Sequence, residues 1–466
     1  MAGIGFALER LTQGRSLSLA AGAYFCAAFL VGGPWIFTIL GIAGISLAAC
    51  QAPCGAVLIF RSVIIYNSVF SLILTSPIAY VCTRYISDRI FVRKYESITF
   101  TFIAGLIAFS SFAAALAGPF YFLATTLTLP EKLASLQNLM LLGASWLLIQ
   151  FLGALRSFVT VSVAFACSAT VMVGLVALAF SSTPFWLLSA FNFGLCMIDF
   201  VLVWRLTREY GVRLSPDFGL LRTAFTHWEL PLIGLTYSAG IWIDKLIMWI
   251  AAPPGAMRVA GALRTMPDYD TPMFWAQLAT LPVAAVFFVH VETNFFRLCR
   301  GLYRRIPEHA SLRELEQLMA HLGRFVLTSV VALFFALASI GALGILSSFV
   351  AIDHLGFRAN QMPILRNAII GMICHSSAMF CFIFFLYLDL KRPALVLSTG
   401  FLVLNGALTM ALLPFGSTFF AFGNVLASVI TFVAAIVLLM RELPWLLFHV
   451  FVTNNQSLKG RARVSG

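Results

Sequence analysis

The stretch PLIGLTYSAGIWIDKLIMWIAAP, residues 231–253, decides the fold of this protein. It is long enough to cross a bilayer as one helix, yet Asp244 and Lys245 stand side by side near its centre. Charged side chains at membrane depth are costly, so they face protein or water and mark functional sites. The stretch therefore predicts a helix of a membrane protein that carries a polar site.

Two interpretations of this charged pair are open. Adjacent helical residues point about 100° apart, so we expect Asp244 and Lys245 not to pair well with each other. In the first interpretation, each has a fixed partner on a neighbouring helix, which would be Arg61 or Arg366 for Asp244 and Asp199 for Lys245. In the second, both line a hydrated transport path. The candidates for that path are Tyr237, Gly240, Trp242, Asp244 and Lys245.

The whole chain has the composition of a multi-pass membrane protein. It has 466 residues, of which 61% are hydrophobic and 10% are charged, and long apolar runs recur throughout. We therefore expect an all-α membrane protein with twelve transmembrane helices. The predicted spans are residues 17–48, 59–83, 98–126, 133–155, 158–181, 185–204, 230–252, 272–292, 325–350, 363–388, 394–413 and 418–440.

The positive charges predict the orientation of the chain. The net charge is +12, but most Lys and Arg residues fall in alternate loops, which is the pattern of a membrane protein and not of a nucleic-acid binder. Under the positive-inside rule, the loops at 84–97 and 293–324 and both termini are cytoplasmic. We expect a protein of the inner membrane in contact with the lipid bilayer.

No catalytic motif accompanies these spans. The sequence has no phosphate-binding glycine loop with a following Lys, no HExxH, and no Cys or His spacing typical of a metal site. We therefore expect neither an enzyme nor a metal or organic cofactor.

The two halves of the chain echo each other. Gly33-Pro34-Trp35 in the first predicted span corresponds to Gly240-Ile241-Trp242 in the seventh, and Gly33, Pro34 and Trp35 are also candidates for a helix break. The pattern predicts two six-helix bundles related by an internal repeat. The expected segments are an interfacial helix at 1–16, bundles at 17–204 and 230–441, a cytoplasmic linker at 205–229, and an interfacial segment with a basic tail at 442–466.

One loop carries its own helix signature. Ser311-Leu312-Arg313-Glu314 fits a capping box, and Leu312, Leu315, Met319 and Leu322 form an apolar stripe behind it. This stripe predicts either a helix lying on the membrane surface or a docking face for a cytoplasmic partner.

The sequence resembles the PelG family of Pel-type exopolysaccharide transporters, within the multidrug/oligosaccharidyl-lipid/polysaccharide (MOP) flippase superfamily. The residues that carry the resemblance are residues 1–6, Gly33-Pro34-Trp35, residues 83–89, Tyr237, Gly240, Trp242, Asp244, Lys245, Glu292-Thr293 and residues 387–389. Ala7 and Gly32 depart from the family pattern, which indicates a divergent member.

The resemblance implies a transporter that moves a growing polysaccharide, rich in N-acetylgalactosamine, across the inner membrane. It implies work beside a cytoplasmic glycosyltransferase and small inner-membrane components, among them a cyclic-di-GMP receptor. The alternatives are a cation-coupled antiporter, in which Asp244 exchanges a proton, or a lipid-linked oligosaccharide flippase of the same superfamily. A membrane-embedded glycosyltransferase is a further alternative, but it predicts a large loop with acidic metal ligands that this sequence lacks.

Overall fold

The structure is a computed structural model, and it describes residues 38–49, 54–93, 95–152, 158–178, 183–212, 219–305, 311–348 and 357–448. Gly33, Pro34 and Trp35, the predicted interfacial helix at 1–16, both termini and the basic tail lie outside these residues. The helix-break and terminus predictions are therefore untested.

The first half of the described chain is helical. A short helix, Thr38–Ala48, comes first. The elements that follow are α3 (Cys54–Phe91), η1 (Tyr95–Ser97), α4 (Ile98–Pro119), a π-helical turn η2 (Phe120–Ala124), α5 (Leu129–Leu152), α6 (Phe158–Ala177), α7 (Pro184–Tyr210) and α8 (Gly219–Thr226).

The second half begins with α9 (Glu229–Ala251), which is the stretch that opened the sequence analysis. A two-stranded antiparallel hairpin, β1 (Met257–Ala260) and β2 (Leu263–Thr265), follows it. The remaining elements are α10 (Pro267–Arg305), α11 (Leu312–Leu346), η3 (Ala359–Gln361), α13 (Met362–Tyr387), α14 (Lys391–Leu412), η4 (Leu413–Phe415), η5 (Ser417–Phe419), α15 (Phe422–Glu442), η6 (Leu443–Trp445) and α16 (Leu446–Phe448).

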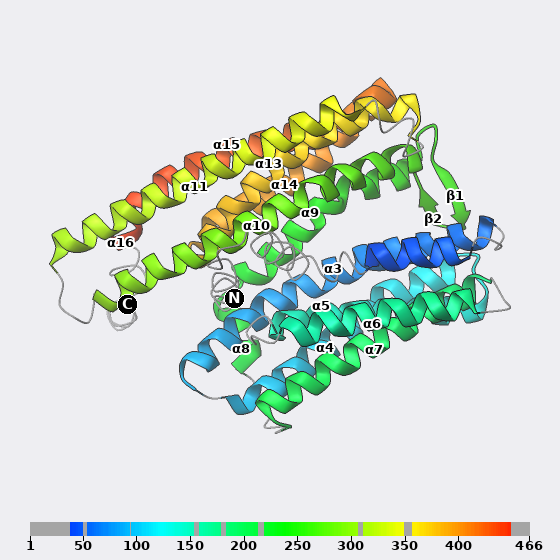
Figure 1. Ribbon diagram of the computed structural model, residues 1–466, viewed down its shortest axis with the longest axis horizontal. Coiled ribbons are helices and arrows are strands. Elements are labelled where there is room, and N and C mark those ends of the chain that lie inside the picture. The colour runs from blue at the N-terminus through cyan, green and yellow to red at the C-terminus, as the bar shows by residue number, and fades with distance from the viewer. Residues whose placement is uncertain are drawn as a thin grey trace, which may run out of the picture.

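The long helices gather in two groups. Figure 1 shows α3 to α7 in the lower part of the molecule and α9 to α15 in the upper part. Within the first group α5 packs on α3 and α7, and within the second α14 packs on α9 and α15. Of the described helices, eight are long and apolar enough to cross a membrane. The protein is thus a helical, multi-pass membrane protein, while the count of twelve spans and the internal repeat stay predictions.

The seam between the two groups is the contact of α3 with α9. Ser238 on α9 donates to Ser76 Oγ on α3 at 2.6 Å. One turn earlier, a Cβ added to Gly234 would stand 2.7 Å from the carbonyl oxygen of Ser76 and 3.0 Å from the nitrogen of Pro77. The absence of a side chain at Gly234 therefore allows the two backbones to approach closely, as small residues do in membrane helices.

The hairpin cross-links one end of the seam. At the end that carries β1 and β2, called the hairpin end here, Tyr66 of α3 donates to the carbonyl oxygen of Arg264 at 3.0 Å. Gly261, at φ +65°, turns the hairpin against η2, where the amide of Ala262 donates to the carbonyl oxygen of Ala124 at 2.9 Å. The opposite end, which includes Arg84, Arg89, Arg205, Arg208 and Arg222, is called the arginine-rich end.

The predicted surface helix at 311–322 is not a separate element. Ser311 caps a helix start as predicted, since its Oγ accepts from the amide of Glu314 at 3.3 Å, but the helix continues as α11 to Leu346. Leu315 and Leu322 are buried, and the start of α11 packs on η6 and α16. The apolar stripe is therefore largely used inside the fold, with only Leu312 well exposed and Met319 half-buried. The docking face stays a prediction.

Candidate functional site

Asp244 and Lys245 pair with each other, contrary to the sequence prediction. Lys245 Nζ lies 2.9 Å from Oδ2 and 3.1 Å from Oδ1 of Asp244, and it also donates to the carbonyl oxygen of Ile241 at 3.3 Å. The lysine side chain is long and flexible enough to fold back along its own helix, so the angle between adjacent Cβ bonds does not prevent the contact. Both residues are buried, with 0% of Asp244 and 7% of Lys245 exposed.

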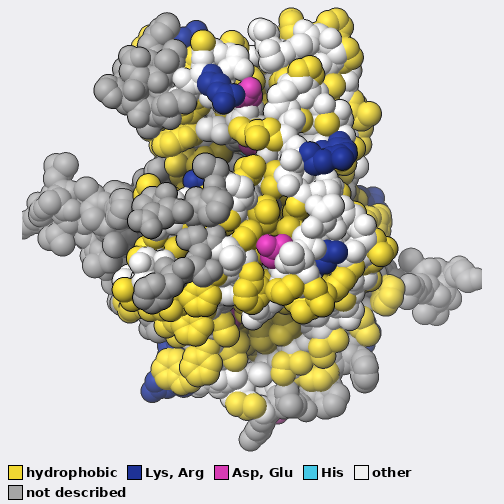
Figure 2. Space-filling model, turned by 90° about the vertical axis from the view of Figure 1, so that its right-hand side faces the viewer, with side chains coloured by type: hydrophobic (Ala, Val, Ile, Leu, Met, Phe, Trp, Pro, Cys, Tyr) yellow, Lys and Arg dark blue, Asp and Glu magenta, His cyan; other side chains and the backbone are white. Residues whose placement is uncertain are grey.

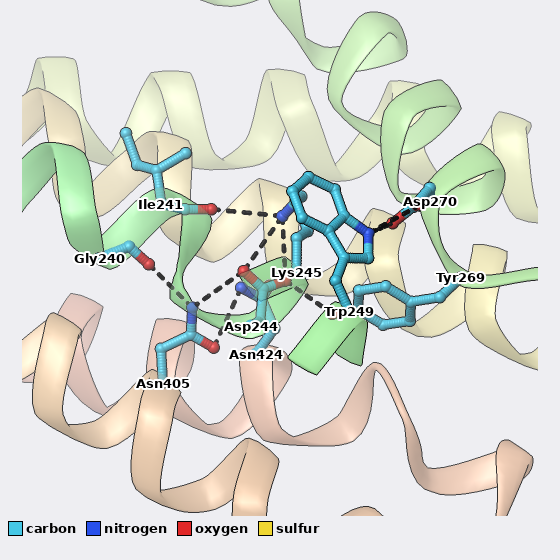
Figure 3. Close-up of polar contacts among 9 residues, drawn as sticks. All are labelled: Gly240, Ile241, Asp244, Lys245, Trp249, Tyr269, Asp270, Asn405 and Asn424. Carbon is cyan, nitrogen blue, oxygen red and sulfur yellow. Dashed lines mark hydrogen bonds and ion pairs between the residues drawn. The ribbon is translucent and has the colours of Figure 1, made fainter. Parts of the chain in front are cut away.

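Two further side chains complete the surroundings of Asp244 (Figure 3). Tyr269, in the first turn of α10, donates to Asp244 Oδ2 at 2.6 Å, and Asn405 of α14 approaches Oδ1 at 3.5 Å. A buried carboxylate needs this compensation, because an isolated charge in a dry interior is strongly unfavourable. Neither partner was predicted. The only sequence signal for them is a polar residue inside or beside an apolar span.

A second layer holds these partners in place. Asn405 donates to the carbonyl oxygen of Gly240 at 2.9 Å, and Asn424 of α15 approaches Asn405 Oδ1 at 3.4 Å. On the other side, Trp249 Nε1 donates to the carboxylate of Asp270 at 3.0 and 3.1 Å. Four helices, α9, α10, α14 and α15, thus contribute to one connected polar cluster (Figure 3).

The path candidates divide between two faces of α9. Ser238 bonds to α3, and Trp249 stacks on Tyr66 of α3 with ring centroids 4.7 Å apart. Trp242 and Lys245 lie between these contacts at helical spacing, so they face the seam. Lys245 Nζ is 5.5 Å from the centre of the Trp242 ring, which is a cation–π distance.

The other three candidates face the second helix group. Tyr237 stacks on Phe382 of α13 with centroids 4.9 Å apart, and Gly240 packs against Phe401 of α14. Asp244 accepts a hydrogen bond from Asn405, which is also on α14. The ion pair therefore joins the seam face of α9, at Lys245, to the interior of the second group, at Asp244.

The cluster lies in the half of α9 that is nearer to the hairpin. Asp244 is seven residues before Ala251, the last residue of the helix, which corresponds to about 10 Å of helix. Tyr269 belongs to the first turn of α10, directly after the hairpin. The site therefore lies on the hairpin side of the centre of α9, within reach of Tyr269.

The partners proposed from sequence for the pair are engaged elsewhere. Arg61 donates to Ser46 Oγ at 2.9 Å, Arg366 donates to Ser348 Oγ at 3.1 Å, and Asp199 accepts from Ser145 at 2.6 Å. That prediction is wrong, because the nearest opposite charge is the adjacent residue itself. Among the described residues, no group of three or more potential ligands could hold a metal ion.

The first helix group has a buried amide network of its own. Asn67 donates to Asn138 Oδ1 at 2.9 Å, and Asn138 donates to Asn192 Oδ1 at 2.8 Å. Tyr121, in the π-helical turn η2, donates to Asn67 Oδ1 at 2.6 Å. Hydrogen-bonded amides hold membrane helices together, so this network fixes α3, α5 and α7 relative to one another.

A charged network joins the two helix groups at the arginine-rich end. Arg84 of α3 donates to Asp389 Oδ1 at 3.3 Å, and Lys391 Nζ lies 3.3 Å from the same oxygen. Lys391 Nζ also lies 2.9 Å from Nδ1 of His227, just before α9. The contact is favourable when the imidazole is neutral, because Lys391 then donates to Nδ1.

This contact predicts a pH dependence. Burial lowers the pKa of His227 below its usual value of 6.5, and the charges of Lys391 and Arg84 lower it further, against Asp389 and Asp88. Because the folded state favours the neutral form, the contribution is present above the unfolded pKa and is lost as the pH falls through the folded pKa. We expect the melting temperature in detergent to fall more below about pH 6.5 for the wild type than for His227→Gln. Equal falls would contradict this assignment.

The helical fold is shared with solved membrane transporters. A MOP superfamily transporter from Pyrococcus furiosus is similar at a TM-score of 0.61 with 11% identity, covering 95% of this chain and 97% of that chain. A variant of the Vibrio cholerae MATE transporter VcmN gives a TM-score of 0.60, 12% identity, and coverages of 94% and 97%. An outward-facing multidrug resistance MATE family transporter is similar at a TM-score of 0.60 with 11% identity. The match covers 90% of this chain and 96% of that chain. At these identities the likeness establishes the fold.

The family follows from the sequence. This chain belongs to the PelG family, whose model, described as "Putative exopolysaccharide Exporter (EPS-E)", matches residues 1–451. The match confirms the resemblance drawn from the sequence. Among curated proteins, no sequence matches this chain.

Proposed function

We propose that this protein moves a growing Pel-type exopolysaccharide, rich in N-acetylgalactosamine, across the inner membrane between its two helix groups. The observation that carries the proposal is the exopolysaccharide-exporter family match over residues 1–451. The transporter fold supports it, because that fold is shared with MOP superfamily proteins over nearly the whole chain.

The seam between α3 and α9 is the proposed path. Trp242 and Lys245 face it, and Tyr66 and Trp249 form an aromatic stack at its hairpin end. Aromatic faces suit the apolar faces of sugar rings, while a lysine offers donors to hydroxyl groups. Tyr237, Gly240 and Asp244 lie behind this surface, so their role in the path is to hold Lys245 and the shape of α9.

The proposed architecture has twelve spans in two six-helix bundles related by an internal repeat. The hairpin end then faces the periplasm, and both termini and the arginine-rich end face the cytoplasm. Figure 1 supports this orientation, since the last residues of α3, α7 and α10 and the first residues of α11 lie toward one end of the molecule. A polymer made in the cytoplasm would enter there and leave beside the hairpin.

The proposed partners follow from the family. They are a cytoplasmic glycosyltransferase at the arginine-rich end and small inner-membrane components, including a cyclic-di-GMP receptor. A cation-coupled antiporter is the second candidate, because MATE multidrug transporters share the fold. The contact between Asp244 and Lys245 disfavours the antiporter, because the ammonium group of Lys245 occupies the place beside the carboxylate that a coupling cation would take.

Deleting the gene separates export from synthesis. We expect secreted polymer to disappear while glycosyltransferase activity, measured as sugar incorporation in a cell lysate, stays at the wild-type level. Restoring the gene on a plasmid is the control. Loss of sugar incorporation in the lysate would favour an enzyme, and secretion that persists without the protein would contradict the proposal. In cells that have the protein, secretion that stops when the ion gradient is collapsed would favour the antiporter mechanism.

A further inference from the structure

A second site is present at the hairpin end, apart from the charged cluster. A cavity of about 510 Å³ lies between the end of α9, the start of α10, η3, and the turns η4 and η5. This volume falls in the range of small-molecule sites, which are roughly 300–1,000 Å³. Figure 2 shows this end of the molecule, where the exposed side chains are mostly apolar or uncharged.

The polar wall of the cavity is built on Asp268. Its Oδ1 accepts from Arg358 at 3.2 Å and from Gln361 at 3.2 Å, and its Oδ2 accepts from the side-chain amide of Asn360 at 3.1 Å. These donors, from η3 and its N-cap, fix the carboxylate before any ligand arrives. An exposed amide and a carboxylate oxygen with lone pairs remaining can then bind further hydroxyl groups. Ser417 adds an exposed hydroxyl across the cavity.

The rest of the lining is mostly apolar. It includes Ile364, Leu413, Pro414 and Phe420, and the backbone at Gly416, with φ +95°, turns between η4 and η5 beside it. Apolar side chains together with planar polar side chains suit a pyranose ring, which has one C–H face and a rim of hydroxyl groups. The charge of Asp268 is matched by Arg358, so the cavity favours a neutral ligand over a free anion or cation.

We propose that this cavity binds one saccharide unit of the exported polymer as it leaves the seam. The choice of a saccharide rests on the proposed function, because the polymer must pass this end of the second helix group. The cavity is distinct from the Asp244 cluster. Asp268 and Asn360 lie between predicted spans, and no role was predicted for them. Binding here would hold the emerging chain and oppose its return.

The test measures binding by the full-length protein in lipid nanodiscs. The probe is a tetrasaccharide of N-acetylgalactosamine, titrated by calorimetry. Asn360→Leu removes the amide at similar size, and Ser417→Trp fills the cavity from an exposed position. Thr418→Trp is the matched control, because Thr418 is its exposed neighbour in η5 but does not line the cavity.

We expect saturable binding to the wild type and to Thr418→Trp, roughly tenfold weaker binding to Asn360→Leu, and none to Ser417→Trp. Absence of binding to the wild type, or unchanged binding to Ser417→Trp, would overturn the inference. The proposed function is judged separately, by secretion in the deletion strain. A protein required for secretion that does not bind the probe would therefore refute this site and leave the transporter assignment standing.

Discussion

Replacing either member of the buried pair alone should strongly destabilise the protein, whereas replacing both should not. In Asp244→Asn, the ammonium group of Lys245 stays buried without its counter-charge. In Lys245→Met, the carboxylate of Asp244 stays buried without its counter-charge. Breaking a buried ion pair by removing one partner typically costs about 3–5 kcal/mol, while replacing the whole pair by neutral groups is often tolerated. The double variant Asp244→Asn/Lys245→Met should therefore recover most of the lost stability.

The measurement is the melting temperature in detergent for the two single variants and the double variant, with polymer secretion measured in parallel. Asp88→Asn is the matched control, because it removes one partner of an exposed pair with Arg84, and such pairs contribute about 0–1 kcal/mol. Unchanged melting of both single variants would contradict the buried pair.

Secretion by the double variant separates the two interpretations of the site. If it folds with near-wild-type stability and still fails to secrete, the pair acts in the path through its seam-facing member Lys245, because the fold has been restored and only the two charges are missing. If stability and secretion return together, the pair serves only to hold α9 against α10 and α14. The position of Lys245 beside Trp242 on the seam face leads us to expect the first result.

The helices were predictable because apolar runs directly report membrane-spanning segments. Residues 230–252 were predicted and α9 covers Glu229–Ala251, and residues 363–388 were predicted and α13 covers Met362–Tyr387. The predicted ends of the helices were wrong where a helix continues past the apolar run into charged sequence. The helix α10 extends to Arg305 and α11 begins at Leu312, since backbone hydrogen bonds do not depend on the hydropathy that marked the spans.

The site was predictable only in part, because its partners are distant in sequence. The charges at Asp244 and Lys245 were conspicuous inside an apolar stretch, but Tyr269, Asn405 and Asn424 carry no signal that distinguishes them from other polar residues. Folding brings them together across four helices. The hairpin at 257–265 was missed for a related reason, since two short strands among charged residues lack an alternating pattern long enough to recognise.

Placing even a methyl group at Gly234 should damage the seam. The added Cβ of Gly234→Ala would meet the carbonyl oxygen of Ser76 at 2.7 Å, its carbon at 2.8 Å and the nitrogen of Pro77 at 3.0 Å. All three are backbone atoms, so no side-chain rotation can relieve the clash. Either α3 and α9 must separate or α3 must bend at Pro77, and overpacking of this kind typically costs about 1–3 kcal/mol. Separation would also stretch the 2.6 Å hydrogen bond between Ser238 and Ser76.

We therefore expect Gly234→Ala to lower the melting temperature and to reduce secretion, because the proposed path runs along this contact. Gly174→Ala in α6 is the matched control, since a Cβ there meets nothing within 4 Å. Alanine favours the helix over glycine by up to about 1 kcal/mol, so the control should melt at the wild-type temperature or slightly above it. Opposite signs for two identical substitutions would isolate the backbone contact as the cause. If both variants melt and secrete like the wild type, α3 and α9 do not approach as closely as the structure has them, and the proposed path along the seam loses its structural basis.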